Sequence, residues 1–182
     1  MSTRLSPTYP LLELVPGSNP FATTFLESQY DFQAELEIID LGTPGLDLPI
    51  YLSGVDAVIF VDAAQFDEEP GSIRLYRKSD ILRNPPRARL DPHSPALQES
   101  LSLVELTGEM PSDFLLVGVQ GSCFDLGASL TTPVRRAVPR VMSMVLSELK
   151  RLNVSCSPAL NIRRPGIWWD AVLDGYPGTL YA

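Results

Sequence analysis

The chain has 182 residues, enough for one domain with a sizeable core, and 45% of them are hydrophobic against 20% charged. Its formal net charge of −8 argues against nucleic acid or an anionic membrane as a partner, because both favour a basic protein surface. No apolar run reaches the roughly 20 residues that span a bilayer, and the N-terminal residues lack the layout of a signal peptide. Two cysteines, Cys123 and Cys156, are too few for a disulfide framework, so we expect reduced thiols in a cytoplasmic protein.

Hydrophobic patterning predicts strands and helices that follow one another along the chain. In chain order the predicted elements are a strand at 11–15, a helix at 22–31 with Phe21, Phe25 and Leu26 inward, a strand at 35–40, a short helix at 46–51, a strand at 55–62, an edge strand at 72–76, a long loop at 77–93, a helix from Ser94 to Gly108, a strand at 114–119 and a long helix from Thr132 to Leu152 that Pro139 kinks or begins. This order predicts an α/β fold, a three-layer α/β/α sandwich with a mostly parallel twisted sheet. We expect residues 1–154 to form this domain and residues 155–182 a C-terminal extension without periodic structure.

The stretch Val55–Asp62 is almost entirely apolar and shows no alternation. That pattern is typical of a strand buried on both faces in the middle of a parallel sheet. The run ends on Asp62, and the carboxyl end of a central parallel strand is where open α/β sheets bind their ligands. The alternative is that Asp62 caps the turn after the strand, since Asp is a common turn former.

The single histidine, His93, immediately precedes the helix that begins near Ser94. Asp62 and His93 can therefore meet at one edge of the sheet, where an imidazole and a carboxylate suit zinc or nickel. Two ligands are too few to hold a metal tightly, so such a site needs a third protein group or ligands from a partner. The alternative is that a lone histidine is a structural residue.

No nucleophilic machinery is evident in the sequence. Ser94 adjoins His93 in the chain, which is not the spatial arrangement of a catalytic triad, and there is no Gly-x-Ser-x-Gly or phosphate-binding glycine motif. Cys123 is either a reactive thiol or, as we prefer, a buried apolar residue.

A set of motifs between residues 36 and 152 resembles the nickel–iron hydrogenase maturation endopeptidases. These motifs are Glu37–Gly45, Asp56–Ala63, Pro70–Gly71, Asp91–Ser94, Leu106–Pro111, Val117–Gln120 and Gly127–Thr131. Each is short, but their common order makes the resemblance specific. It implies an α/β/α endopeptidase that removes the C-terminal peptide of the hydrogenase large subunit precursor once nickel has been inserted.

The resemblance also implies roles for individual residues. Asp62 and His93 match proposed nickel ligands of that family, and Asp40 and Thr43 match a characteristic segment that we assign to substrate recognition. The nickel is carried by the substrate, so we expect no tightly bound cofactor of the protein's own. The expected partner is the large subunit precursor, and the resemblance identifies no further catalytic residue.

The N-terminal segment departs from the family pattern. Leu14–Pro20 resembles the family's first strand and turn, but Phe21–Phe25 follows without the acidic-glycine segment that carries the first metal ligand. Glu13, Glu27 and Asp31 are nearby carboxylates that do not match the motif. This departure leaves two alternatives open: a non-catalytic, chaperone-like member that only binds the precursor, or a ligand-binding α/β domain unrelated to hydrogenases.

Overall fold

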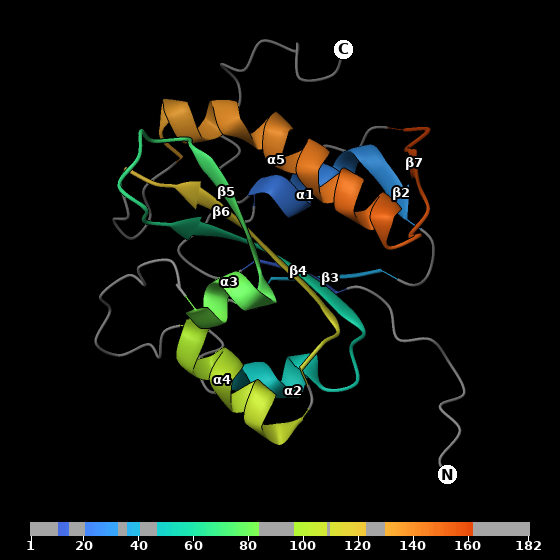
Figure 1. Ribbon diagram of the computed structural model, residues 1–182. Coiled ribbons are helices and arrows are strands. Elements are labelled where there is room, and N and C mark those ends of the chain that lie inside the picture. The colour runs from blue at the N-terminus through green and yellow to red at the C-terminus, as the bar shows by residue number, and fades with distance from the viewer. Residues whose placement is uncertain are drawn as a thin grey trace.

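The computed structural model describes residues 11–14, 21–32, 36–40, 47–83, 97–108, 110–122 and 130–161, which form a sheet between two layers of helices (Figure 1). The strands are β1 (Leu11–Leu14), β2 (Tyr30–Phe32), β3 (Glu37–Asp40), β4 (Ala57–Ala64), β5 (Ile73–Arg77), β6 (Asp113–Gln120) and β7 (Cys156–Pro158). The helices are α1 (Phe21–Gln29), α2 (Leu48–Leu52), α3 (Lys78–Arg83), α4 (Leu97–Thr107) and α5 (Thr132–Arg151). None of the helices in the described ranges is long and apolar enough to cross a membrane.

The main sheet has the strand order β3-β1-β4-β6-β5. Its pairings are parallel except for β5, which lies antiparallel to β6 at the edge. The central position of β4 and the edge position of β5 were both predicted. All residues from Ala57 to Val61 are buried, which explains why that stretch shows no alternation of polar and apolar residues.

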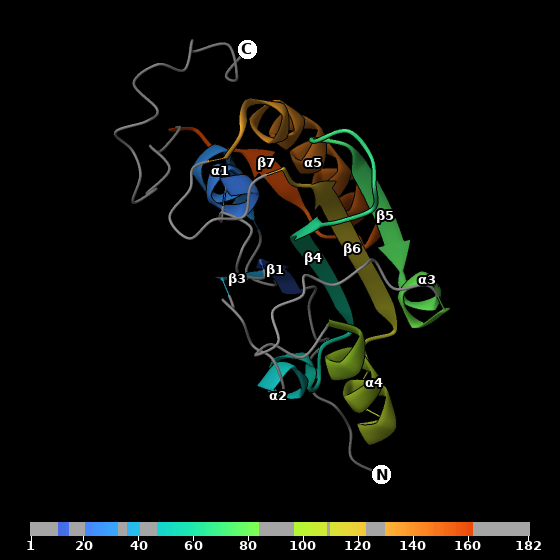
Figure 2. The same ribbon diagram turned by 90° about the vertical axis from the view of Figure 1, so that its left-hand side faces the viewer.

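Helices cover both faces of the sheet (Figures 1 and 2), and each face carries its own apolar core. Successive side chains of a strand point to opposite faces. Ile59 and Val61 of β4 therefore pack in the cluster with α1 and α5, and Val58 and Phe60 pack in the cluster with α2, α3 and α4. Helices on both faces of a mostly parallel sheet confirm the predicted three-layer α/β/α sandwich.

Helix α3 corrects the prediction of an irregular loop over residues 77–93. Asp80 accepts a hydrogen bond from the backbone N–H of Arg77 at 2.8 Å, which satisfies a donor at the start of the helix. Ile81 is almost fully buried in the cluster with α2 and α4. The segment's charged composition concealed a helix that is held by one apolar anchor and a cap.

Strands β2 and β7 form a separate two-stranded antiparallel sheet. We expected residues 30–31 to continue the preceding helix and residues 155 onward to have no regular element, so both predictions were wrong at this point. Phe32 pairs with Cys156, more than a hundred positions along the chain, and no local pattern encodes such a contact. The division of the chain at residue 154 stays a prediction.

An ion-pair network joins the start of β6 to the end of α5. The Glu148 side chain is buried and accepts hydrogen bonds from Arg77 Nη2 at 2.9 Å and Arg151 Nη2 at 2.8 Å. Arg151 also contacts Asp113. Burial alone would raise the pKa of Glu148, but the hydrogen bonds from Arg77 and Arg151 outweigh it and hold that pKa at about 2.

Candidate functional site

Asp62 lies on the central strand, close to the carboxyl edge of the sheet. Strand β4 continues to Ala64, two residues beyond the predicted end, because its pairing with β6 runs on to Gln120. Asp62 follows Val58 and Phe60 at intervals of two, which places it on the face covered by α2, α3 and α4. It is half-buried, whereas the strand residues before it are buried, so its carboxylate lies where the core opens to solvent.

One hydrogen bond of Asp62 is made within its own strand. Its Oδ1 accepts from the backbone N–H of Ala63 at 2.6 Å. The turn that follows β4 comes later, at residues 67–71, where Asp67 and Gly71 have positive φ angles. This bond therefore does not cap that turn, and whether Asp62 has any capping role stays untested.

Gly118 lies beside Asp62 on the neighbouring strand, because the two are register partners of β4 and β6. A Cβ atom at position 118 would lie 3.0 Å from the Ala64 Cβ and 3.4 Å from a ring carbon of Tyr76. A larger residue would have to displace those neighbours. Gly118 therefore leaves the sheet surface next to Asp62 free of a side chain. It belongs to the motif Val117–Gln120, to which the sequence analysis assigned no role.

The chain that follows β4 is fastened to the end of β6 by Gln120, whose side chain is buried. Its Oε1 accepts a hydrogen bond from the backbone N–H of Phe66 at 2.8 Å, and its Nε2 donates to the Gly121 carbonyl at 3.0 Å. The backbone of Gln120 is bonded to Gly71 and Ser72 at 2.9 and 2.8 Å. Gln120 is therefore a positioning residue that fixes the loop of residues 65–72 at the Asp62 edge.

The same loop is held from two further sides. Gly71 has a φ of 87°, and a Cβ there would lie 2.6 Å from the Pro133 carbonyl oxygen, so only glycine fits beneath the start of α5. Arg74 donates from Nε to Glu68 at 2.9 Å and lies 4.9 Å from the centre of the Phe66 ring. The loop of residues 65–72 is therefore fixed on three sides and forms a rigid wall next to the candidate site.

Asp40, predicted to take part in substrate recognition, is the last residue of β3. Leu14 of β1 is the register partner of both Asp40 and Val61. Asp40 therefore lies level with Val61, the residue directly before Asp62. Strand β1 separates them, which puts the two backbones about 10 Å apart at the same edge of the sheet. The topology thus brings both predicted residues to one edge.

His93 and Thr43, the other two predicted site residues, lie outside the described residues. Helix α4 begins at Leu97, four positions after His93, and ends at Thr107, shortly before the start of β6. Its beginning therefore lies toward the carboxyl ends of β4 and β6, on the side to which their arrowheads point (Figure 1). Helix α4 also covers the sheet face that carries Asp62.

The three N-terminal carboxylates lie in different places. Glu13 of β1 is the register partner of Phe60, which lies two residues before Asp62 in β4. Glu27 is exposed on α1, and Asp31 is exposed on β2, which pairs with β7. Both of these belong to elements on the α5 side of the sheet, opposite the face of Asp62. Within the described ranges no three His, Cys, Asp or Glu side chains are grouped as a metal site would need.

Comparison with known proteins places this arrangement in a class. Residues 22–148 match the family model of hydrogenase maturation proteases. The fold is similar to that of the hydrogenase maturating endopeptidase HybD from Escherichia coli, with a TM-score of 0.72 and 25% sequence identity over 82% of this chain and 97% of that one. The chain belongs to the hydrogenase maturation protease family, as its motifs predicted.

Individual relatives agree with that class. The chain is 31% identical to the hydrogenase expression/formation protein HupM of Azotobacter chroococcum over 73% of its length and 64% of the relative. It is 28% identical to the hydrogenase 2 maturation protease of Escherichia coli over 73% of its length and 81% of the relative. The match thus spans less than two thirds of HupM, and likewise 63% of HoxM of Azotobacter vinelandii.

Proposed function

We propose that this protein is an endopeptidase that removes the C-terminal peptide from the large subunit precursor of a nickel–iron hydrogenase after nickel insertion. One observation carries the proposal: a half-buried carboxylate, Asp62, lies at the carboxyl edge of the central strand in a fold of the hydrogenase maturation protease family. Open α/β sheets bind their ligands at this edge. The proposed place of action is the cytoplasm, in keeping with the few cysteines of the chain.

In this proposal nickel arrives with the substrate. An oxygen of Asp62 and an imidazole nitrogen of His93 bind the precursor's metal, a donor pair that suits a borderline ion such as nickel. Two protein ligands leave coordination positions for groups that the precursor itself supplies. The loaded precursor therefore gains a contact that the metal-free precursor lacks, and metal insertion raises the population of the productive complex.

The remaining parts of the edge have supporting roles. Asp40 and Thr43 contact the precursor's polypeptide on the β3 side of the site. The loop of residues 65–72, braced by Gln120 and Arg74, forms a wall on the β5 side. A rigid wall favours catalysis because the substrate segment is held in one orientation relative to the metal-binding pair.

The test compares nickel-loaded and nickel-free precursor in a cleavage assay read by mass spectrometry. We expect the unmodified protein to release the C-terminal peptide from the nickel-loaded precursor but not from the nickel-free precursor. Asp62→Ala and His93→Ala should abolish the release, and His93→Ala should change the free energy of unfolding by only about 0.5 kcal/mol if it is a loop residue. Glu37→Ala, an exposed carboxylate at the opposite end of β3, is the matched control and should cleave normally.

The same assay separates the proposal from its alternatives. Nickel-dependent binding without loss of the peptide would identify a chaperone-like member and refute the endopeptidase. Neither binding nor cleavage would favour a ligand-binding domain that acts on something else. No feature of the described residues favours either alternative.

A further inference from the structure

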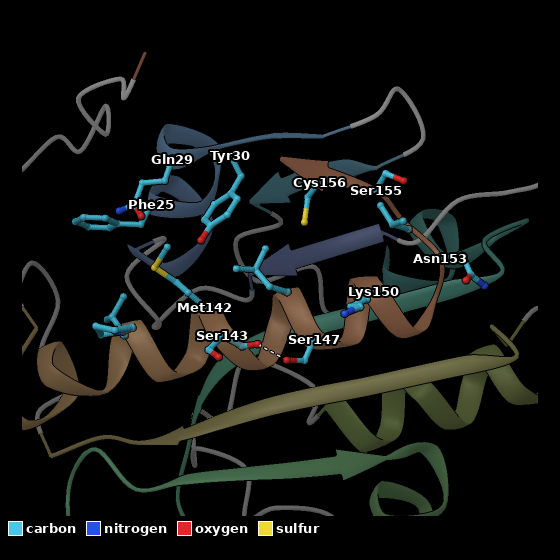
Figure 3. Close-up of a pocket in the computed structure, with 14 residues that line it drawn as sticks. Phe25, Gln29, Tyr30, Met142, Ser143, Ser147, Lys150, Asn153, Ser155 and Cys156 are labelled. Atoms are coloured by element: carbon cyan, nitrogen blue, oxygen red, sulfur yellow. Dashed lines mark hydrogen bonds between the residues drawn. The ribbon is translucent and has the colours of Figure 1, made fainter. Parts of the chain in front are cut away.

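A groove runs along the face of the molecule opposite Asp62, between α5 on one side and α1 with β2 on the other (Figure 3). Its volume is about 770 Å³. Phe25 and Met142 are buried in its floor, and Tyr30 and Leu146 are partly exposed in its walls. Sites of roughly 300–1,000 Å³ with this kind of lining bury most of an apolar ligand.

The C-terminal part of the chain is tied to the end of this groove. Cys156 of β7 lines it, and the backbone N–H of Ala159 donates to the carbonyl of Gln29, another lining residue, at 2.8 Å. The described chain ends two residues later, at Asn161, and residues 162–182 follow. The described chain therefore ends close to the rim of the groove.

We propose that the segment 162–182 docks into this groove through Trp168 and Trp169. These are the only two tryptophans of the chain. Large aromatic rings gain most from burial, and the thioether of Met142 makes favourable contacts with aromatic rings. Two indole groups are of the size that a groove of this volume accommodates.

Length and charge agree with this occupant. Trp168 follows the anchored Ala159 by nine residues, which reach roughly 30 Å when extended. The α5 wall from Val138 to Lys150 is only about 18 Å long. Among the described lining residues the charged one is Lys150, and Asp170 directly follows the tryptophan pair in the sequence. A docked pair would bring a carboxylate within range of that ammonium group.

Tryptophan fluorescence tests the proposal directly, because both tryptophans lie in the segment. In the full-length native protein we expect emission at the short wavelengths of buried indole and weak quenching by acrylamide. Ser143→Glu and Leu146→Glu place a charge in the groove, so each should shift the emission to longer wavelength and raise the quenching constant several-fold. Ser143 is exposed, so its variant keeps the core intact.

The matched control is Arg140→Glu, an exposed position of the same helix that does not line the groove. It should leave emission and quenching unchanged. As an independent measure, the full-length Trp168→Ser/Trp169→Ser variant should react several-fold faster at Cys156 with a thiol reagent. Emission typical of free indole in the native protein would overturn the proposal. So would groove variants that match the Arg140→Glu control while circular dichroism shows them folded.

Discussion

Two carboxylates at opposite ends of the sheet are treated differently by the fold. Glu148, near the start of β6, is buried and held by two arginines, so its charge is compensated within the protein. Asp62, near the end of β4, is half-buried, and its Oδ1 accepts from the neutral backbone N–H of Ala63. The network at the amino edge therefore holds α5 and β5 on the sheet, whereas the carboxyl edge is where open α/β sheets bind their ligands and where we propose the site.

The largest expected effect comes from removing the Asp62 charge. Asp62→Asn keeps the shape of the side chain. We expect the cleavage of nickel-loaded precursor to fall at least about a hundredfold, because losing only a partner that supports a metal ligand already costs about 10–100-fold. The free energy of unfolding in urea should change by less than about 1 kcal/mol. The assignment would be wrong if the variant cleaved normally but unfolded at much lower urea.

Replacing Glu148 should have the reverse effect of replacing Asp62: it should change the free energy of unfolding, and this change should depend on pH. Its pKa is about 2 in the folded protein against 4.5 for the free side chain, so the network stabilises the fold fully above pH 4.5 and the effect is lost as the pH falls toward 2. The shift corresponds to at most about 3 kcal/mol. Urea unfolding across this range should show a steeper loss for the unmodified protein than for Glu148→Gln.

Glu105→Gln is the matched control for that experiment, because Glu105 makes an exposed pair with Lys78 at 3.5 Å. Such pairs contribute about 0–1 kcal/mol, so this variant should follow the unmodified protein. An equal pH profile for Glu148→Gln and the unmodified protein would contradict the role given to the network.

A smaller effect is expected at the wall beside Asp62. Gln120→Leu leaves the buried N–H of Phe66 without its acceptor, which should cost about 1–3 kcal/mol of unfolding free energy. The loosened loop should also raise the KM for the precursor more than it lowers kcat. Gln65→Leu, an exposed residue of the same loop, is the control. A normal KM for Gln120→Leu would show that the loop does not contact the substrate.

The smallest signal is expected from metal alone. With one imidazole and one carboxylate predicted at the site, the isolated protein should bind nickel or zinc weakly, and more weakly as the pH falls, because protons compete with the metal for the imidazole. Isothermal titration calorimetry at several pH values measures this. Tight stoichiometric binding would reveal a third protein ligand and overturn the account of the N-terminal segment.

The sequence by itself determined the framework of this protein. The unbroken apolar runs of β4 and β6 identified the buried centre of a parallel sheet, and the end of the first run placed Asp62 near the carboxyl edge of that sheet. These features are visible in the local sequence, because a strand that is buried on both faces needs an apolar residue at nearly every position.

Tertiary structure decided which distant residues meet. The pairing of Phe32 with Cys156, the clamp of Gln120 on Phe66 and the burial of Glu148 between two arginines each join residues far apart in the chain. A local pattern records whether a side chain is buried but not which partner it has. A buried polar group needs such a partner, and only the packed fold supplies it.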